Sequence, residues 1–281
     1  MTLSDAERSA LIEAVRRAAR DHVLPRFRAL SPADIATKSA ADDLVTAADL
    51  AAEASLTQAV AHIFPGALVV GEEAAAADPV LPSRIADADL TVIIDPVDGT
   101  WNYANGLSVF GMILSVVRDG RTVFGIHYDP LNDDWVEAGL GTGAWLQHNG
   151  RHPLRLAPRP PRPASELFGM IPIWLFDADR RKAMFAAERQ LARVGSLRCS
   201  CHEYRLLAQG SVDFLLSATA KCWDHAGGVL ITTEAGGAAE MLDGSAYRPG
   251  ESQGSLLAAR DRATLEAVRD LITMVDQAPT G

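Results

Sequence analysis

The chain has 281 residues, which is enough for one large domain or two smaller ones with a full-sized hydrophobic core. Its content of 48% hydrophobic and 22% charged residues is ordinary for a globular protein. The formal net charge of −10 disfavours a surface that binds a nucleic acid polymer or an anionic membrane. It does not exclude an anionic substrate, because bound metal ions invert the local electrostatic potential.

The N-terminal residues carry neither the basic flank nor the apolar core of a signal peptide. No apolar stretch approaches the roughly 20 residues that span a bilayer, so we expect a cytoplasmic protein that does not enter a membrane. Three cysteines, Cys199, Cys201 and Cys222, are too few for a disulfide framework and lack the paired spacing of a zinc site. We therefore expect three buried free thiols.

Helices and an antiparallel sheet are predicted for the first half of the chain. Ser4 and Glu7 form a capping-box pattern before a helix, and Thr46 opens a second helix that runs to about residue 64. Apolar runs predict strands over residues 68–70 and 90–94, then hairpins over residues 107–127 and 135–149. Residues 1–150 therefore read as an α+β part with a mainly antiparallel sheet.

The segment at 151–163, rich in proline and arginine, is the best candidate for a boundary, although it also suits a rigid crossing within one domain. Beyond it, helical and strand patterns alternate, which predicts an α/β part over residues 151–281 with helices on both faces of its sheet. The predicted helices cover residues 177–193, a segment opening after Trp223, and a last one to about 275. The predicted strands cover residues 194–197, 212–216 and 255–259.

Residues 93–103, which read IIDPVDGTWNY, carry the most functional information in the sequence. Asp95 and Asp98 follow an apolar run that is typical of a buried strand, and Pro96 predicts that the chain turns there. The turn would free the carbonyl of Val97. Clustered hard oxygen ligands of this kind suit Mg²⁺, while a turn with two solvated aspartates is the alternative.

Gly99 and Thr100 follow directly and offer backbone N–H groups, which suit the oxygens of a phosphate. A glycine also lets the backbone approach a phosphate closely, because it lacks a Cβ atom.

Three further acids stand where a strand ends or a helix begins. Glu72 follows the strand at 68–70, Asp224 opens the helix near Trp223, and Asp49 lies in the first turn of the second helix. Asp49 and Asp224 also suit a purely structural role beside the helix dipole, and Glu72 suits a solvated turn. His225 is interpreted as a residue of the helix start rather than a metal ligand.

Together these segments resemble the inositol monophosphatase family of magnesium-dependent, lithium-sensitive phosphatases. The resemblance rests on Gly71-Glu72-Glu73, on Asp95-Pro96-Val97-Asp98-Gly99-Thr100, and on Trp223-Asp224 with the downstream Glu234-Ala235-Gly236-Gly237. Lys38, eleven residues before Asp49, fits the same pattern, and the likeness extends over about residues 35–260. It implies a layered αβαβα sandwich, with the site between the two parts, and a homodimer.

The resemblance also implies a role for each of these residues. Glu72, Asp95 and the carbonyl of Val97 would hold a first Mg²⁺, while Asp95, Asp98 and Asp224 would hold a second; such sites bind roughly two or three ions. Glu72 and Thr100 would orient a metal-activated water, supported by Asp49 through Thr100. Asp98, Gly99 and Thr100 would also contact the substrate phosphate.

The substrate stays open because the sequence departs from the family pattern at one position. Inositol-selective members have a glutamate seven residues before the aspartate of the Trp-Asp pair, and here that position is Ser217. Lys221 suits either a second anionic group of the substrate or a surface loop, and Trp101 suits either the mouth of the site or packing beneath the turn. Ser217 and Lys221 are therefore candidate substrate-binding residues.

We expect Mg²⁺-dependent hydrolysis of a small, soluble phosphate monoester. Candidate substrates are inositol monophosphate, a sugar phosphate, histidinol phosphate and a 3′-phosphorylated adenosine nucleotide, so 3′(2′),5′-bisphosphate nucleotidase and histidinol-phosphatase activities are alternatives on the same scaffold. A catalytically silent protein that binds a phosphorylated metabolite and an interaction or chaperone-like role are alternatives from other classes.

Overall fold

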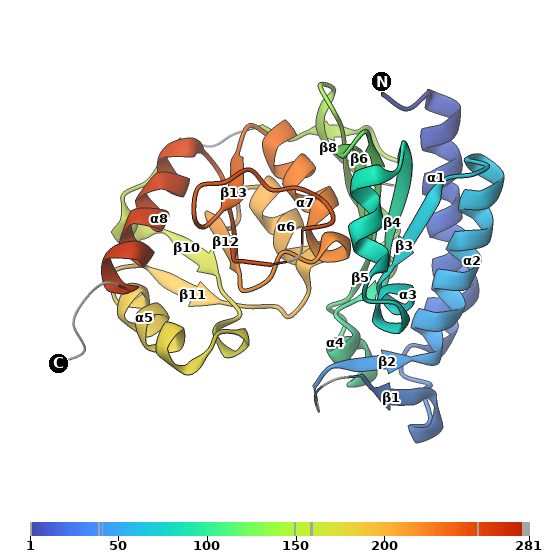
Figure 1. The fold of residues 1–281 in the computed structure, drawn as a ribbon, viewed down its shortest axis with the longest axis horizontal. Helices are drawn as coiled ribbons and strands as arrows, with labels where there is room; N and C mark the ends of the chain where they lie inside the picture. Colours follow the sequence, from blue (N-terminus) through green and yellow to red (C-terminus); the bar gives the residue numbers. More distant parts are fainter. Residues whose placement is uncertain are drawn as a thin grey trace.

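The computed structural model describes residues 2–38, 40, 42–148, 150–157, 160–251 and 253–276. The elements stack as helices, sheet, helices, sheet and helices (Figure 1). Helices α1 (Asp5–Ala18) and α2 (Ala47–Ile63) form one outer layer, and α5 (Ala178–Glu188) and α8 (Arg262–Asp276) form the other. Helices α6 (Ser200–Ala208) and α7 (Cys222–Glu234) lie between the two sheets. The predicted αβαβα sandwich is confirmed.

Capping boxes start both N-terminal helices, where the sequence predicts a capping box at Ser4 and a helix start at Thr46. The Ser4 side chain accepts a hydrogen bond from the Glu7 amide, and the Glu7 carboxylate accepts one from the Ser4 amide. Thr46 and Asp49 form the same box at α2. A π-helical turn (Ala19–Val23) and short 3₁₀ turns follow α1, and the strands β1 (Ile35–Thr37) and β2 (Leu44–Thr46) pair antiparallel before α2.

Seven strands form the first sheet, in the order β3-β4-β5-β6-β7-β8-β9. Only β3 and β4 run parallel, so the prediction of a mainly antiparallel sheet is confirmed. Their bounds are β3 Leu68–Gly71, β4 Leu90–Asp98, β5 Gly111–Arg118, β6 Arg121–Asp129, β7 Asp134–Gly139, β8 Gly143–His148 and β9 Leu154–Arg155. Strand β9 lies inside the proposed boundary segment and extends this sheet; residues 158 and 159 of that segment lie outside the described residues.

The prediction that the chain turns at Pro96 is wrong, because β4 continues through it to Asp98. Strand β4 pairs with β5 up to Asp95, and the register shifts before Asp98 pairs with Gly111. Proline lacks the N–H that a ladder requires, so the strand accommodates it as a local irregularity. The sharp change of direction comes one residue after the strand, at Gly99, before the short helix α4 (Thr100–Ala104).

Five strands form the second sheet, in the order β11-β10-β12-β14-β13. The pairs of β10 with β11 and β12 are parallel, and the pairs of β14 with β12 and β13 are antiparallel. Their bounds are β10 Phe168–Met170, β11 Arg193–Gly195, β12 Phe214–Ser217, β13 Ala238–Met241 and β14 Leu256–Ala259. The predicted helix at 177–193 ends earlier, at Glu188, and the helix expected after Trp223 begins at Cys222.

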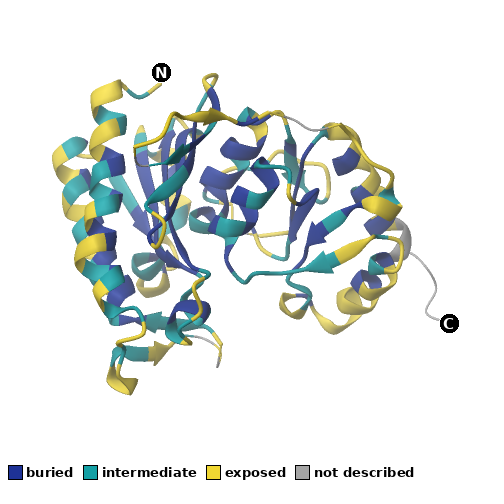
Figure 2. Cartoon of the chain, turned by 180° about the vertical axis from the view of Figure 1, so that it is seen from behind, coloured by how far each residue is buried: buried dark blue, intermediate teal, exposed yellow. Residues whose placement is uncertain are grey.

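Helix α7 is the central element, and its glycines bring it to backbone distance from its neighbours. A Cβ atom on Gly125 of β6 would lie 2.7 Å from the Cα atom of Gly227, and one on Gly228 would lie 2.3 Å from the Tyr204 ring of α6. Figure 2 shows this region as buried, in contrast to the exposed outer helices. Within the described ranges, no helix is both long and apolar enough to cross a membrane.

The close approach of β6 and α7 predicts that Gly125→Ala destabilises the protein by about 1–3 kcal/mol, because the new methyl group meets backbone atoms that have little room to move. Gly195→Ala is the matched control, since its Cβ atom would meet its nearest neighbour at 3.7 Å, an ordinary contact. Chemical denaturation of both variants measures the difference. Equal stability of the two variants would contradict the account of α7 packing.

Candidate metal centre and substrate pocket

A pocket of about 410 Å³ opens where elements of both parts of the chain meet. Its walls come from the end of β4, the starts of α4, α6 and α7, the end of β12 and the β1–β2 connection. The starts of α6 and α7 present backbone N–H groups and the positive ends of two helix dipoles, which favour an anion. The lining includes most of the predicted site residues: Glu72, Asp95, Asp98, Gly99, Thr100, Ser217, Lys221 and Asp224.

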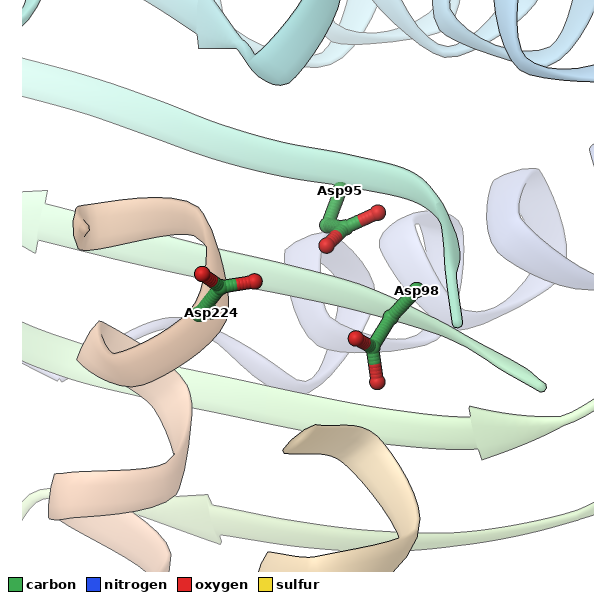
Figure 3. A group of neighbouring side chains, drawn as sticks. All are labelled: Asp95, Asp98 and Asp224. Carbon is green, nitrogen blue, oxygen red and sulfur yellow. The ribbon is translucent and has the colours of Figure 1, made fainter. Parts of the chain in front are cut away.

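Three carboxylates meet in this pocket. Oxygen atoms of Asp95, Asp98 and Asp224 all lie within 4.8 Å of one another. Figure 3 shows the two β4 aspartates and the aspartate of the first turn of α7 facing a common space. Asp95 and Asp98 are buried, at 1% and 6% exposure, and Asp224 is half-buried. The family resemblance implied this meeting of two segments that are more than a hundred residues apart.

Burial and mutual repulsion raise the pKa of these acids. Burial raises the pKa of Asp95 well above its usual range, with Glu72 and Asp98 adding to the shift. Burial, then the charge of Asp224, raises the pKa of Asp98 to about 8. Each shift means that the site disfavours the charged form of these acids without a compensating cation.

The donor set fits a hard divalent cation such as Mg²⁺. Carboxylate oxygens are the ligands that this ion prefers, and Asp95 Oδ1 is a buried oxygen that has no hydrogen-bond partner among the described residues. An unsatisfied buried oxygen is costly unless an ion or a water occupies the space in front of it.

Asp98 is fixed by the start of α6, a contact that the sequence analysis missed. The backbone N–H of Cys201 donates to Asp98 Oδ2, and the thiol of Cys199 lies 3.0 Å from the same oxygen. All three cysteines are free and buried, as predicted. No local pattern marks this contact, because the two segments are about a hundred residues apart.

Glu72 lies in the pocket but is held by a lysine rather than grouped with the three aspartates. Lys38 Nζ lies 2.9 Å from Glu72 Oε1 and 2.7 Å from Glu73 Oε1. Helix α3 (Glu72–Ala77) is fixed in turn by buried Glu53, which accepts hydrogen bonds from the amides of Glu73 and Ala74. Lys38 therefore links the β1–β2 segment to the predicted ligand Glu72.

Thr100 contacts Asp49, as the family resemblance implies, and it also contacts the carbonyl of Val97. Its hydroxyl lies 2.9 Å from the carbonyl oxygen of Val97 and 3.3 Å from Asp49 Oδ1. The other Asp49 oxygen accepts hydrogen bonds from the amide and hydroxyl of Thr46. Burial raises the pKa of Asp49 to about 6. The Thr100 hydroxyl has one proton, so it donates to Val97 or to Asp49.

Gly99 is required by both conformation and space. Its φ of +85° lies in the left-handed region, and a Cβ atom there would lie 3.0 Å from the carbonyl oxygen of Val109 and 3.2 Å from Cys199 Cβ. The glycine therefore lets the turn between β4 and α4 lie directly against the start of α6.

On the side of the pocket beyond the acids, Ser217 is part of a hydrogen-bonded chain. Its hydroxyl lies 3.1 Å from His225 Nε2, and His225 Nδ1 lies 3.1 Å from the Tyr204 hydroxyl. Burial lowers the pKa of His225 to about 4, so the imidazole is neutral at pH 7. Lys221 lines the pocket with its ammonium 5.6 Å from the centre of the Trp223 ring, and Trp101 lines it as well.

The sequence profile of the inositol monophosphatase family matches residues 5–274, so the chain belongs to this family. An inositol-1-monophosphatase of Caulobacter vibrioides is 30% identical over 240 residues, which cover 84% of this chain and 89% of that protein. A protein of Pasteurella multocida named Nus factor SuhB is 28% identical over 246 residues, covering 84% of this chain and 85% of that protein. The family is magnesium-dependent, which agrees with the acidic cluster.

Solved structures show the same fold. Inositol monophosphatase II from Staphylococcus aureus superposes with a TM-score of 0.80 at 21% identity and covers 98% of each chain. An inositol monophosphatase from Zymomonas mobilis has a TM-score of 0.78 at 23% identity and covers 96% of this chain and 100% of that one.

The raised pKa of Asp98 predicts a pH-dependent effect of Asp98→Asn on stability. The unfolded chain releases this proton near pH ~3.9, whereas the folded protein holds it to about pH 8. Between these values the folded state binds the extra proton, so the stabilisation falls as the pH rises. In EDTA, wild type should therefore lose melting temperature relative to Asp98→Asn between pH 5.5 and 8.

Excess Mg²⁺ should raise the melting temperature of wild type above that of Asp98→Asn, because the ion binds the folded wild type and compensates the buried charges. Thermal melts of both proteins with EDTA and with Mg²⁺ measure this change in the sign of the difference between their melting temperatures. Asp179→Asn, at a carboxylate whose side chain is 94% exposed, is the control and should follow wild type. An equal rise of all three proteins with Mg²⁺ would contradict the assignment of the site.

Proposed function

We propose that the protein is a Mg²⁺-dependent phosphatase that hydrolyses a small phosphate monoester. The observation that carries the proposal is the group of three facing carboxylates, Asp95, Asp98 and Asp224, on the wall of an open pocket. Their charges would repel an anionic ester in the absence of cations. Glu72 and the Val97 carbonyl, both close to this group in the fold, are proposed as further ligands.

Mg²⁺ bound here would neutralise the ester and lower the pKa of a water molecule that attacks phosphorus. The chain itself would supply position and proton control. Backbone N–H groups of Gly99 and Thr100 would hold phosphate oxygens, with Asp98 beside them. Thr100 would take a proton from the attacking water as its own hydroxyl proton passes to Asp49, which lies 3.3 Å away. Glu72, which also lines the pocket, would orient the same water.

The residues that line the pocket determine which phosphate monoesters the protein accepts. Ser217 is short, and its hydroxyl already contacts His225, so inositol is not specifically favoured. The 3′(2′),5′-bisphosphate nucleotidase and histidinol-phosphatase activities are alternatives, with Ser217 and Lys221 as proposed contacts. A catalytically silent role in binding a phosphorylated metabolite is a further alternative. One relative is named Nus factor SuhB, a name that describes that protein and assigns no role to this chain. We also propose that the protein is a cytoplasmic homodimer. Each chain would consist of two parts, with the boundary near residue 150.

Phosphate release from a panel of monoesters tests the proposed reaction. Inositol 1-phosphate, fructose 1,6-bisphosphate, histidinol phosphate and 3′-phosphoadenosine 5′-phosphate are each assayed with Mg²⁺ and with EDTA. The proposal expects turnover of at least one ester that EDTA abolishes and Asp98→Asn lowers by a factor of 100 or more. Tight phosphate or ester binding without turnover of any member would instead favour the silent protein.

Thr100→Val should lower kcat by a factor of about 100–10,000 while leaving Mg²⁺ affinity within a few-fold, because it removes the hydroxyl and keeps the shape of the side chain. Steady-state kinetics and calorimetric Mg²⁺ titration measure the two quantities. Thr142→Val is the matched control at an exposed threonine whose hydroxyl donates to the carbonyl of Gly139. An unchanged kcat for Thr100→Val would remove this residue from the proposed mechanism.

A further inference from the structure

A stack of two indoles and a guanidinium, from Trp101, Trp174 and Arg198, forms part of the wall of the pocket that contains the acids. The guanidinium carbon of Arg198 lies 4.5 Å from the ring centre of Trp101 and 5.1 Å from that of Trp174. Arg198 Nη2 also lies 3.0 Å from Asp42 Oδ2. Because each face-on contact between a cation and an aromatic ring is attractive, the stack holds Trp174 in place.

The stack joins segments that are distant in the sequence. Trp101 belongs to α4, Trp174 to the 3₁₀ turn Ile173–Leu175, and Arg198 to the segment that leads into α6. Arg198 has a φ of +54°, in the left-handed region that arginine seldom adopts. Such strain persists only where the surrounding contacts fix the conformation. Here the two indoles and Asp42 hold the side chain, and the backbone N–H donates to the Ser196 hydroxyl.

Large apolar side chains at this wall remain accessible. Trp174 is 39% exposed and Leu175 is 55% exposed, and both line the pocket. Pro172 and Leu256 line it too. An aromatic ring held rigidly at the mouth of a pocket offers a stacking surface without an entropic cost of ordering it.

Two polar side chains that line the pocket, Glu203 and Ser217, are already engaged in hydrogen bonds. The Glu203 carboxylate accepts hydrogen bonds from the Ser196 hydroxyl at 2.8 Å and the Leu197 amide at 2.6 Å. Ser217 contacts His225, as described above. A polyol would have to compete with these bonds, whereas a flat apolar group would leave them intact.

We propose that Trp174, fixed by its contact with Arg198, is a subsite for a flat aromatic group on the alcohol part of the substrate. The subsite rests on the proposed phosphatase function and specifies its substrate class. The phosphoryl group would lie at the aspartates, and the aromatic ring would stack on the accessible part of the Trp174 indole. Stacking of this type accepts different aromatic rings, because each presents a π face.

A matched pair of esters tests the subsite. 2-Phenylethyl phosphate and 2-cyclohexylethyl phosphate release similar primary alcohols, so their intrinsic reactivity is alike and they differ in the flatness of the ring. Wild type should hydrolyse the phenyl ester with a kcat/KM about tenfold higher. Trp174→Ala should abolish this preference mainly by lowering kcat/KM for the phenyl ester, and Trp174→Phe should retain it.

Phe185→Ala is the control, because Phe185 is 55% exposed on α5 and is not among the residues that line this pocket. It should keep the wild-type preference. Equal kcat/KM values for the two esters in wild type, or the same preference in Trp174→Ala, would overturn the subsite while the phosphatase function stands.

A binding measurement separates the two proposals if wild type hydrolyses neither ester. Calorimetry with Mg²⁺ compares 3-phenylpropylphosphonate with 3-cyclohexylpropylphosphonate, which mimic the two esters and cannot be hydrolysed. Tighter binding of the phenyl compound that Trp174→Ala removes would support the subsite even though the phosphatase proposal fails. Equal binding of both compounds would overturn the subsite.

Discussion

Burying several carboxylates within a few ångströms of one another raises the free energy of the folded state. The contacts of the surrounding helices and strands hold the carboxylates together despite this repulsion. The charged forms of Asp95 and Asp98 are disfavoured by burial and by their neighbours, which raises the pKa of both groups. A chain selected only for stability would place apolar side chains there. Acids held in this position favour the binding of a divalent cation, which is the basis of the proposed function.

Helix α7 meets this constraint because it packs against both layers around it. Its glycines allow the backbone to approach β6 and the Tyr204 ring, and this approach sets where Asp224 lies relative to β4. The start of α6 fixes Asp98 through the Cys201 amide, and Gly99 lets the β4–α4 turn lie against it. The same contacts therefore determine the shape of the core and the geometry of the site.

Local patterns predicted the elements whose residues interact over short distances. The capping-box pattern at Ser4 and the helix-start pattern at Thr46 predicted the starts of α1 and α2, and apolar runs on either side of turn residues predicted the hairpins of the first sheet. The acids were predicted because each lies in a local sequence motif. Their grouping at one site depends on tertiary structure, and the family resemblance supplied it. Family resemblance supplied the layered architecture.

Features that depend on tertiary contacts escaped the sequence analysis. Pro96 favours a turn locally, but pairing with β5 on both sides of it keeps the strand extended. The amide of Cys201, the ion pairs of Lys38 and the stacking of Arg198 between Trp101 and Trp174 each join distant segments. No spacing rule encodes such contacts, because they arise only once the two sheets and α6 are assembled.

A crystal structure with Mn²⁺ in place of Mg²⁺, together with inorganic phosphate, tests the central claim most directly. Anomalous scattering locates each manganese ion independently of any assumption about the site. The account predicts anomalous density between Asp95, Asp98 and Asp224, with phosphate beside the amides of Gly99 and Thr100. Ordered carboxylates with no anomalous density among them, at Mn²⁺ concentrations that saturate other members of the family, would contradict it.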